Sequence, residues 1–254
     1  MFDTLITPGQ AGAVGIAFTD RHGGASTGSR HSLNLGRSDI DPIPSLRTNM
    51  SLVRQHLGIG PVVGLHQVHG RGVYMVDDDP RDWSGDAWLG DRVGLPALPV
   101  ADAAVTGTHG LALMVRVADC VPVLFADASA GLVGAAHAGR AGLLGGVLEA
   151  TVAALRARGA RSLQAWIGPH ICGSCYEVPA PMAAEAADQL PQCAATTSWG
   201  TPAIDMGAGA AALLTGLDVA VTGHAPCTMT SDALFSHRGD GQQTGRQAGL
   251  VWLH

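Results

Sequence analysis

Three short segments place side chains that bind metals or act as nucleophiles beside small or strand-forming residues. They read Gln-Val-His-Gly at residues 67–70, Ala-Asp-Cys-Val-Pro at 118–122 and Ala-His-Ala-Gly at 136–139. Glycine allows the close backbone approach that sites often need. Two imidazoles and a thiolate suit Zn²⁺, and a fourth, open position would make such a site catalytic. His69, Cys120 and His137 therefore form one candidate metal triad.

The same residues also allow two other interpretations. Cys120 and His137 could be the nucleophile and base of a hydrolase acting on an amide or cell-wall-type substrate, since histidine readily activates a cysteine to the thiolate. Asp119 or Asp127 would then orient the histidine. Alternatively, the thiol and the histidines are structural and hydrogen-bonded in the core. The long-range spacing leaves all three interpretations open.

A second pair of cysteines has the spacing CxxC. Cys172 and Cys175 could be redox-active or could form half of a zinc site. The sequence has no second CxxC, which argues against a zinc ribbon, and two reduced structural thiols are the favoured interpretation. The total of five cysteines is odd, which argues against a disulfide framework.

The charge of the chain excludes several classes of protein. A formal net charge of −6, without a block of like charges, argues against a nucleic-acid partner. All fifteen basic residues are arginine, so the lysine of a pyridoxal-phosphate enzyme or of a P-loop is missing. Any phosphate that the protein handles must therefore meet arginine, histidine, hydroxyl groups or backbone amides.

Length and composition predict one packed domain over residues 1–254. The chain is 46% hydrophobic and 14% charged, which is typical of a globular protein and not of a disordered one. No apolar run reaches the roughly 18 residues of a membrane span. The first residues carry no basic segment of the kind that begins a signal peptide. We expect a cytoplasmic monomer or homodimer without a membrane partner.

The elements that must hold the three segments alternate between strands and helices. Short apolar runs bounded by turn residues predict strands at residues 14–18, 61–65, 72–76, 111–117, 121–126, 132–136, 163–168, 218–222 and 249–253. Helical spacing predicts helices at residues 44–57, 142–157 and 179–190, and the Asp-, Gly- and Pro-rich residues 77–99 predict a surface loop. This alternation predicts a single α/β domain of mixed β-sheets layered between helices.

The ligand segments also stand in order among further motifs. These read Phe-Thr-Asp-Arg-His-Gly-Gly at 18–24, Leu-Asn-Leu-Gly at 33–36, Ala-Asp-Ala at 101–103, Ile-Gly-Pro at 167–169, Cys-Tyr-Glu-Val at 175–178, Cys-Thr at 227–228, Asp-Gly at 240–241 and Thr-Gly-Arg at 244–246. Each motif is weak alone, but the ordered set covers nearly the whole chain. It resembles the laccase-domain, or multicopper-polyphenol-oxidase-like, family of purine nucleoside phosphorylases.

The resemblance implies an α/β fold related to a cysteine-hydrolase-like toxin domain, with zinc on His69, Cys120 and His137. It implies cleavage of adenosine, inosine and guanosine by phosphate to the free base and ribose 1-phosphate. Adenosine deamination is the implied side activity. Multicopper oxidation is not expected, because blue-copper oxidases need several His-rich sites and the chain has no repeated His-x-His clusters.

Phosphorolysis also predicts which side chains meet the substrates. Breaking the glycosidic bond develops positive charge on the ribose and negative charge on the base. The protein must therefore donate a hydrogen bond or a proton to the purine and hold phosphate near the ribose. Asn34 and Gln67 are candidates for polar contacts with the nucleoside. Arg21, Arg238 and Arg246 are candidates for phosphate, because guanidinium pairs with it bidentately, although each could instead form a surface ion pair.

Two departures from the family pattern concern the same substrates. Family members often have Gly-Trp-Arg-Gly after the second zinc histidine, and here Arg140 stands one position earlier. Near the C-terminus the family often has Tyr-Arg-Arg-Asp-Gly, and here His237 and Gly239 replace the tyrosine and one arginine. These differences bear on phosphate affinity and on base preference.

Overall fold

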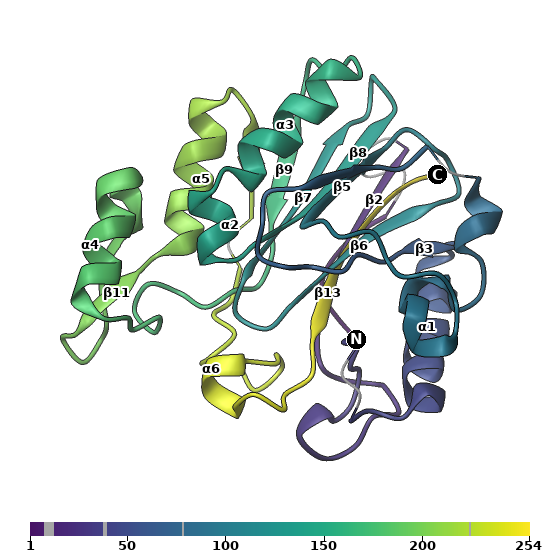
Figure 1. Ribbon diagram of the computed structural model, residues 1–254, viewed down its shortest axis with the longest axis horizontal. Helices are drawn as coiled ribbons and strands as arrows, with labels where there is room; N and C mark the ends of the chain where they lie inside the picture. Colours follow the sequence, from purple (N-terminus) through teal and green to yellow (C-terminus); the bar gives the residue numbers. More distant parts are fainter. Residues whose placement is uncertain (8–12, 38–39, 78, 224) are drawn as a thin grey trace.

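Two β-sheets packed face to face form the centre of the molecule, and helices cover both outer faces (Figure 1). The computed structural model describes residues 1–7, 13–37, 40–77, 79–223 and 225–254. Helix α1 covers one sheet, whereas α3 and α5 cover the other. This arrangement confirms the predicted α/β class with mixed sheets layered between helices.

The first sheet has five strands in the order β1-β2-β13-β6-β3. These strands are β1 (Phe2–Ile6), β2 (Val14–Thr19), β13 (Gln247–Leu253), β6 (Ala112–Val117) and β3 (Val62–Val63). The second sheet has six strands in the order β12-β9-β7-β8-β5-β4. These strands are β12 (Ala220–Thr222), β9 (Gln164–Ile167), β7 (Val121–Asp127), β8 (Leu132–Ala138), β5 (Ala103–Thr106) and β4 (Val73–Met75). Both sheets contain parallel and antiparallel pairs.

The central strands are apolar at nearly every position because both of their faces are covered. Along a strand, successive side chains point to opposite faces of the sheet. On β8, Val133 and Ala135 therefore pack in the layer between the sheets, whereas Ala136 and Ala138 pack in the layer beneath the helices. This alternation fixes the side on which each functional side chain of a central strand must lie.

Helix α1 (Ile43–Leu57) forms as predicted and ends at Gly58, whose φ of +63° requires the left-handed conformation that glycine adopts without cost. The predicted helix 142–157 is instead two helices, α2 (Arg140–Leu144) and α3 (Val147–Ala157). Gly146, with a φ of +91°, separates them. A glycine between two periodic apolar stretches was the available signal for this break.

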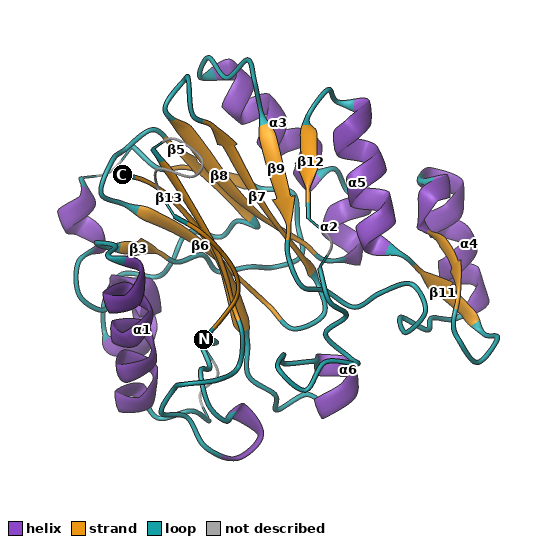
Figure 2. Ribbon diagram, turned by 180° about the vertical axis from the view of Figure 1, so that it is seen from behind, coloured by secondary structure: helices purple, strands orange, loops and turns teal. Residues whose placement is uncertain are grey.

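Several strands and helices were not predicted from the sequence. The missed strands are β5, the N-terminal β1 and the hairpin of β10 (Ala194–Thr196) and β11 (Pro202–Ile204). This hairpin projects with α4 (Ala180–Gln189) beyond α5 (Figure 2). Helix α5 (Met206–Gly216) and the short α6 (His237–Asp240) were also not predicted. The sequence of α5 is rich in glycine, but Asp205 caps it by accepting from the Ala208 amide at 2.8 Å.

The segment 77–99 is not only a surface loop, so that prediction was wrong in part; its residue Asp78 lies outside the described residues. It contains the 3₁₀ helices η2 (Pro80–Trp83) and η3 (Ala87–Val93). Trp83 and Trp88 are buried, and Trp88 packs in the core beneath α1. Large aromatic side chains therefore hold down a segment whose polar composition suggests a free loop.

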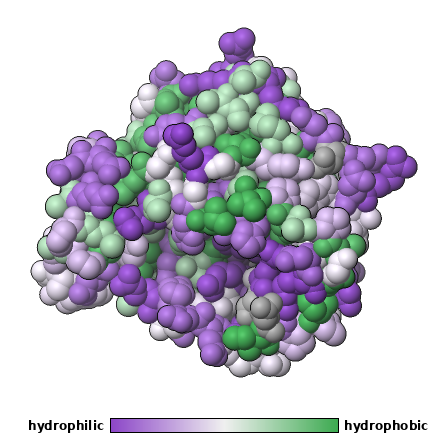
Figure 3. Space-filling model, in the orientation of Figure 1, coloured by the Kyte–Doolittle hydropathy of each residue, from purple (hydrophilic) through white to green (hydrophobic). Residues whose placement is uncertain are grey.

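On the face shown in Figure 3, hydrophobic residues gather in separate patches among hydrophilic ones, and one patch lies near the centre of the view. Within the described part of the chain, helices long and apolar enough to cross a membrane are absent.

Candidate metal centre

The three predicted metal ligands come together although they lie on three separate elements. His69 lies in the loop between β3 and β4, Cys120 in the turn between β6 and β7, and His137 on β8. Their ligand atoms all lie within 4.8 Å of one another, and Cys120 Sγ is 3.6 Å from His69 Nε2. Because β6 and β7 belong to different sheets, the cluster lies where the chain passes from one sheet to the other.

Strand register sets the orientation of His137. Its side chain lies on the same face of β8 as Ala135, which packs between the sheets. The antiparallel pairing of β5 with β8 brings Asp102 opposite His137, whose amide donates to the Asp102 carbonyl at 2.7 Å. Asp102 Oδ1 lies 2.8 Å from His137 Nδ1, so Nε2 is the nitrogen that remains for a metal.

Asp102 also holds the His69 loop. Its carboxylate accepts the backbone amides of Val68, His69 and Gly70 at 3.2, 2.9 and 2.7 Å. Burial would raise the pKa of Asp102, but the hydrogen bonds from His137 and from these amides lower it. The bonds support a φ of +59° at His69, which is unfavourable for a residue other than glycine. One buried carboxylate therefore positions both histidines.

The prediction that Asp119 or Asp127 orients the histidine was wrong. Asp127 lies at the far end of β7 and accepts the backbone amides of Ala130, Arg161 and Ser162. Spacing along the chain could not reveal Asp102, because its place opposite His137 depends on the register of two strands about 30 residues apart.

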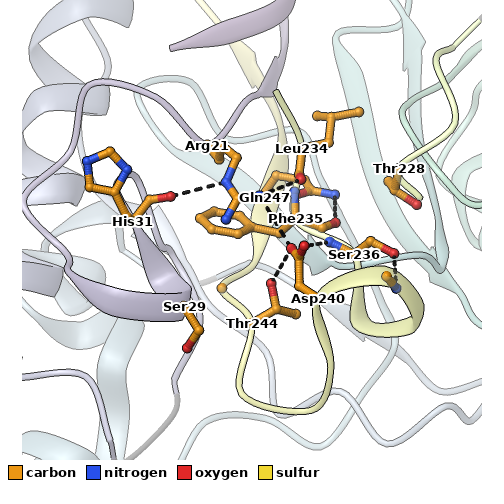
Figure 4. A network of polar contacts seen from close by, with 12 residues as sticks. Arg21, Ser29, His31, Thr228, Leu234, Phe235, Ser236, Asp240, Thr244 and Gln247 are labelled. Atoms are coloured by element: carbon orange, nitrogen blue, oxygen red, sulfur yellow. Dashed lines mark hydrogen bonds and ion pairs between the residues drawn. The ribbon is translucent and has the colours of Figure 1, made fainter. Parts of the chain in front are cut away.

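Asp119 instead ties the Cys120 turn to the C-terminal segment. Its φ is +93°, and its carboxylate accepts the Thr228 and Ser236 hydroxyls at 2.6 and 2.7 Å. It also accepts the backbone amide of Arg238 at 2.6 Å. Ser236 belongs to a network with Asp240, drawn in Figure 4, that shapes the approach to α6. Asp119 therefore connects the turn carrying Cys120 to the helix carrying Arg238.

In the metal-free cluster, the protonation states are those of a thiolate beside a protonated imidazole. Burial would raise the pKa of Cys120, but hydrogen bonds from His137 and His69 outweigh it and lower the pKa to about 6. Burial would lower the pKa of His137, but its bonds with Asp102 and Cys120 raise the pKa to about 9. Cys120 is therefore a thiolate near neutral pH, the form that binds metals and attacks electrophiles. Two nitrogens and this sulfur fit a metal ion, whose binding would displace the proton from His137 Nε2.

Gly139 is required by the packing of two ligands. A Cβ atom at this position would lie 2.4 Å from His69 Cδ2 and 3.2 Å from Cys120 Sγ. Glycine leaves room for both side chains. The glycine that the sequence places after His137 therefore has a steric role at the cluster.

A cavity of about 750 Å³ opens beside the cluster, a size typical of small-molecule sites. Within the described part of its wall, Asp119 is the one carboxylate, and its oxygens already accept several hydrogen bonds. Five arginines line the same wall, namely Arg37, Arg116, Arg140, Arg238 and Arg246. The protein as a whole is acidic, yet this cavity is positively charged and suits an anion.

Three of the five predicted substrate residues line the cavity: Gln67, Arg238 and Arg246. The Gln67 side chain bonds to both the backbone amide and the carbonyl of Arg116, each at 2.9 Å. Arg238 Nη1 donates to the Glu177 carbonyl at 2.9 Å. Arg246 Nη1 likewise donates to the carbonyls of Thr244 and Gly245. Carbonyl partners fix both guanidinium groups without neutralising them, so their charge remains available to a ligand.

The other two, Arg21 and Asn34, lie outside the cavity wall. Arg21 lies 4.6 Å from the centre of the Phe235 ring and contacts Asp240 at 3.4 Å (Figure 4). Asn34 is buried, and its oxygen accepts the amides of Gly36 and Arg246, each at 2.8 Å. Both side chains therefore shape the loops around the cavity.

Sequence reasoning did not single out Arg116, Arg37 or Tyr176, which also line the cavity. Arg116 had a detectable signal, since it is the one charged residue in the apolar run 111–117. A charge within a buried strand is rarely tolerated without a specific partner. Arg140, displaced from its family position, does reach the cavity wall.

The CxxC pair has a third neighbour that the spacing did not reveal. The sulfur atoms of Cys172, Cys175 and Cys227 lie within 4.8 Å of one another. All five cysteines are free in the structure.

Comparisons with known proteins agree with this architecture. A purine nucleoside phosphorylase of Streptomyces griseus is 46% identical over 247 residues, which cover 95% of each chain. A crystal structure of a Neisseria meningitidis protein matches with a TM-score of 0.79 and 33% identity, covering 99% of this chain and 98% of that one. YlmD from Geobacillus stearothermophilus matches with a TM-score of 0.82 and 30% identity, covering 96% and 93%. The family model described as multi-copper polyphenol oxidoreductase laccase matches residues 15–254, and the chain therefore belongs to this family.

Proposed function

We propose that this protein is a zinc-dependent purine nucleoside phosphorylase. It would cleave adenosine, inosine and guanosine with phosphate to the free base and ribose 1-phosphate, with adenosine deamination as a side activity. The names of its relatives support the reaction class. The observation that carries the proposal is the cluster of His69, Cys120 and His137 in the wall of an arginine-lined cavity.

The donor set favours zinc. Two imidazole nitrogens and a thiolate are a common protein ligand set for this metal, and three protein ligands leave one position open. When bound there, zinc supplies a Lewis acid that can polarise an oxygen of the substrate. Asp102 would keep His137 in the tautomer that coordinates through Nε2.

The cavity supplies the remaining requirements of phosphorolysis. An oxygen of phosphate forms a bond to C1′ of the ribose while the bond from C1′ to the purine nitrogen breaks, and the electron pair leaves with the base. The arginines hold the phosphate next to the sugar and lower the cost of bringing an anion to the site. Burial raises the pKa of Tyr176, so its hydroxyl keeps a proton and can donate to the leaving purine.

Three features of the cluster favour a second candidate. The lowered pKa of Cys120, its contact with His137 and the bond from His137 to Asp102 also match a cysteine hydrolase. Such an enzyme needs neither phosphate nor metal, and alkylation of Cys120 would abolish its activity. An amide or cell-wall-type compound would be the substrate.

An assay of adenosine and inosine with and without phosphate separates the two candidates. It is repeated after metal stripping and after return of zinc. Base release that requires phosphate and is restored by zinc supports the phosphorylase. If the nucleosides remain intact under every condition, and a chelator leaves or increases turnover of an amide substrate, the hydrolase is the correct assignment.

A further inference from the structure

The guanidinium of Arg116 lacks a partner for its charge. Arg116 lies on β6 and is only 8% exposed. Its Nη2 donates to the Leu65 carbonyl, whereas Nη1 is buried without a hydrogen-bond partner in the described part of the chain. Buried polar groups are nearly always paired, so an unpaired charged nitrogen calls for an explanation.

The surroundings of Arg116 increase this imbalance. Arg37 lines the same cavity, and the two positive charges repel each other. Burial and this repulsion lower the pKa of Arg116 to about 9. Among the described residues, ion pairs between a carboxylate and Arg116 are absent, whereas Arg37 contacts Asp91. An anion placed between the two guanidinium groups would relieve both the repulsion and the unpaired donor.

Arg116 is also held rigidly beside the ligand cluster. Gln67 bonds to both backbone groups of Arg116, and the Leu65 carbonyl holds its side chain. These two residues shortly precede His69 in the same loop. Such support is expected for a residue that must present its charge at a fixed place next to the reacting groups.

We propose that Arg116, assisted by Arg37, forms the subsite for the phosphate dianion. This inference rests on the proposed phosphorolysis, because it assigns the co-substrate to one end of the same cavity. Arg238 and Arg246 donate to backbone carbonyls and remain for the nucleoside. The phosphate enters as the free anion, with its charge shared by the two guanidinium groups.

The test measures binding of inorganic phosphate without relying on turnover. Thermal unfolding of the zinc-loaded protein is followed with increasing phosphate for the wild type, Arg116→Met, Arg116→Gln and Arg161→Gln. A ligand that binds only the folded state raises the unfolding temperature as its concentration rises. Arg161 is exposed and distant from the cavity, so its variant controls for the loss of one positive charge.

We expect wild type and Arg161→Gln to respond equally to phosphate, and both Arg116 variants to bind it on the order of 10- to 100-fold more weakly. Both should fold without phosphate, because each removes an unpaired buried charge. Equal phosphate affinity in all four proteins would overturn the subsite. So would stabilisation by adenosine 5′-monophosphate but not by inorganic phosphate, since the subsite would then bind a nucleotide.

Kinetics separate this subsite from the proposed reaction. If nucleosides are cleaved, Arg116→Gln should raise the KM for phosphate by a similar factor and change the KM for the nucleoside little. If nucleosides are not cleaved at all, the proposed function fails, but the phosphate titrations still decide whether Arg116 binds the anion. A higher KM for the nucleoside alone would contradict the assignment.

Discussion

Replacement of Asp102 by Asn should weaken metal binding although Asp102 is not one of the three ligands. Oδ1 accepts from His69 N and His137 Nδ1, and Oδ2 accepts from Val68 N and Gly70 N. An amide keeps only one acceptor oxygen, so two of these four groups lose their acceptor whichever way it turns. The amide hydrogens also face N–H groups that cannot accept them.

The magnitude follows from these bonds. Each hydrogen bond to a charged acceptor that is lost in a buried place costs about 1–3 kcal/mol, which gives about 2–6 kcal/mol for two. For a chain of this size each kcal/mol lowers Tm by about 2–4 °C, so we expect a decrease of roughly 5–20 °C in the metal-free protein. Loss of a carboxylate behind a metal-bound histidine typically weakens metal binding 10–100-fold.

Asp127→Asn is the matched control. Asp127 is also buried and also accepts several backbone amides, but at the far end of β7. The Asp127→Asn variant should lose a comparable amount of folding stability. It should keep the zinc affinity of the wild type, measured by competition with a chromogenic chelator. Equal zinc affinity in wild type and Asp102→Asn, or an equal loss in both variants, would refute the positioning role of Asp102.

Four further outcomes are expected. The purified protein should carry about one equivalent of zinc, and Cys120→Ala should lose most of it by elemental analysis, whereas full retention would contradict the ligand assignment. Cys172→Ser and Cys175→Ser should leave zinc content and turnover nearly normal, and loss of zinc in either would place the metal elsewhere. In metal-free protein, the rate of Cys120 alkylation should rise as the pH rises through about 6, because the lowered pKa leaves the thiol ionised above that pH. A midpoint near 8.5 would show that the pKa of the thiol is unperturbed. Gly139→Ala should fold but bind zinc weakly, since its methyl group would displace His69, and unchanged zinc affinity would show that the ring has room to move.

The sequence predicted what depends on local pattern. The buried strands appear as short apolar runs, and α1 ends at Gly58 because glycine adopts the required φ. It could not predict what depends on register or on distant segments. Asp102 meets His137 only through the pairing of β5 with β8, and Cys227 joins the CxxC pair through the fold of the C-terminal segment.

Substrate residues were the least predictable part of the site. Motif position identified Gln67, Arg238 and Arg246, which reach the cavity, but it could not distinguish them from Arg21 and Asn34, whose polar groups are used by neighbouring loops. A polar side chain in a motif can serve a substrate or a turn, and only the positions of its partners decide between them. Arg116 shows the reverse case, because its place in an apolar run indicated burial but its unpaired nitrogen is visible only in three dimensions.

The turn carrying Cys120 has a consequence for how the cavity can open. It links the two sheets through only a few residues, so this wall cannot move unless one packed sheet slides over the other. The C-terminal segment around α6 also lines the cavity, and polar contacts of Asp119 with Ser236, Thr228 and Arg238 attach it to this turn. Binding and release of ligands should therefore depend on local opening of the C-terminal segment. Amide hydrogens near α6 should then exchange with solvent well before those of β7 and β8.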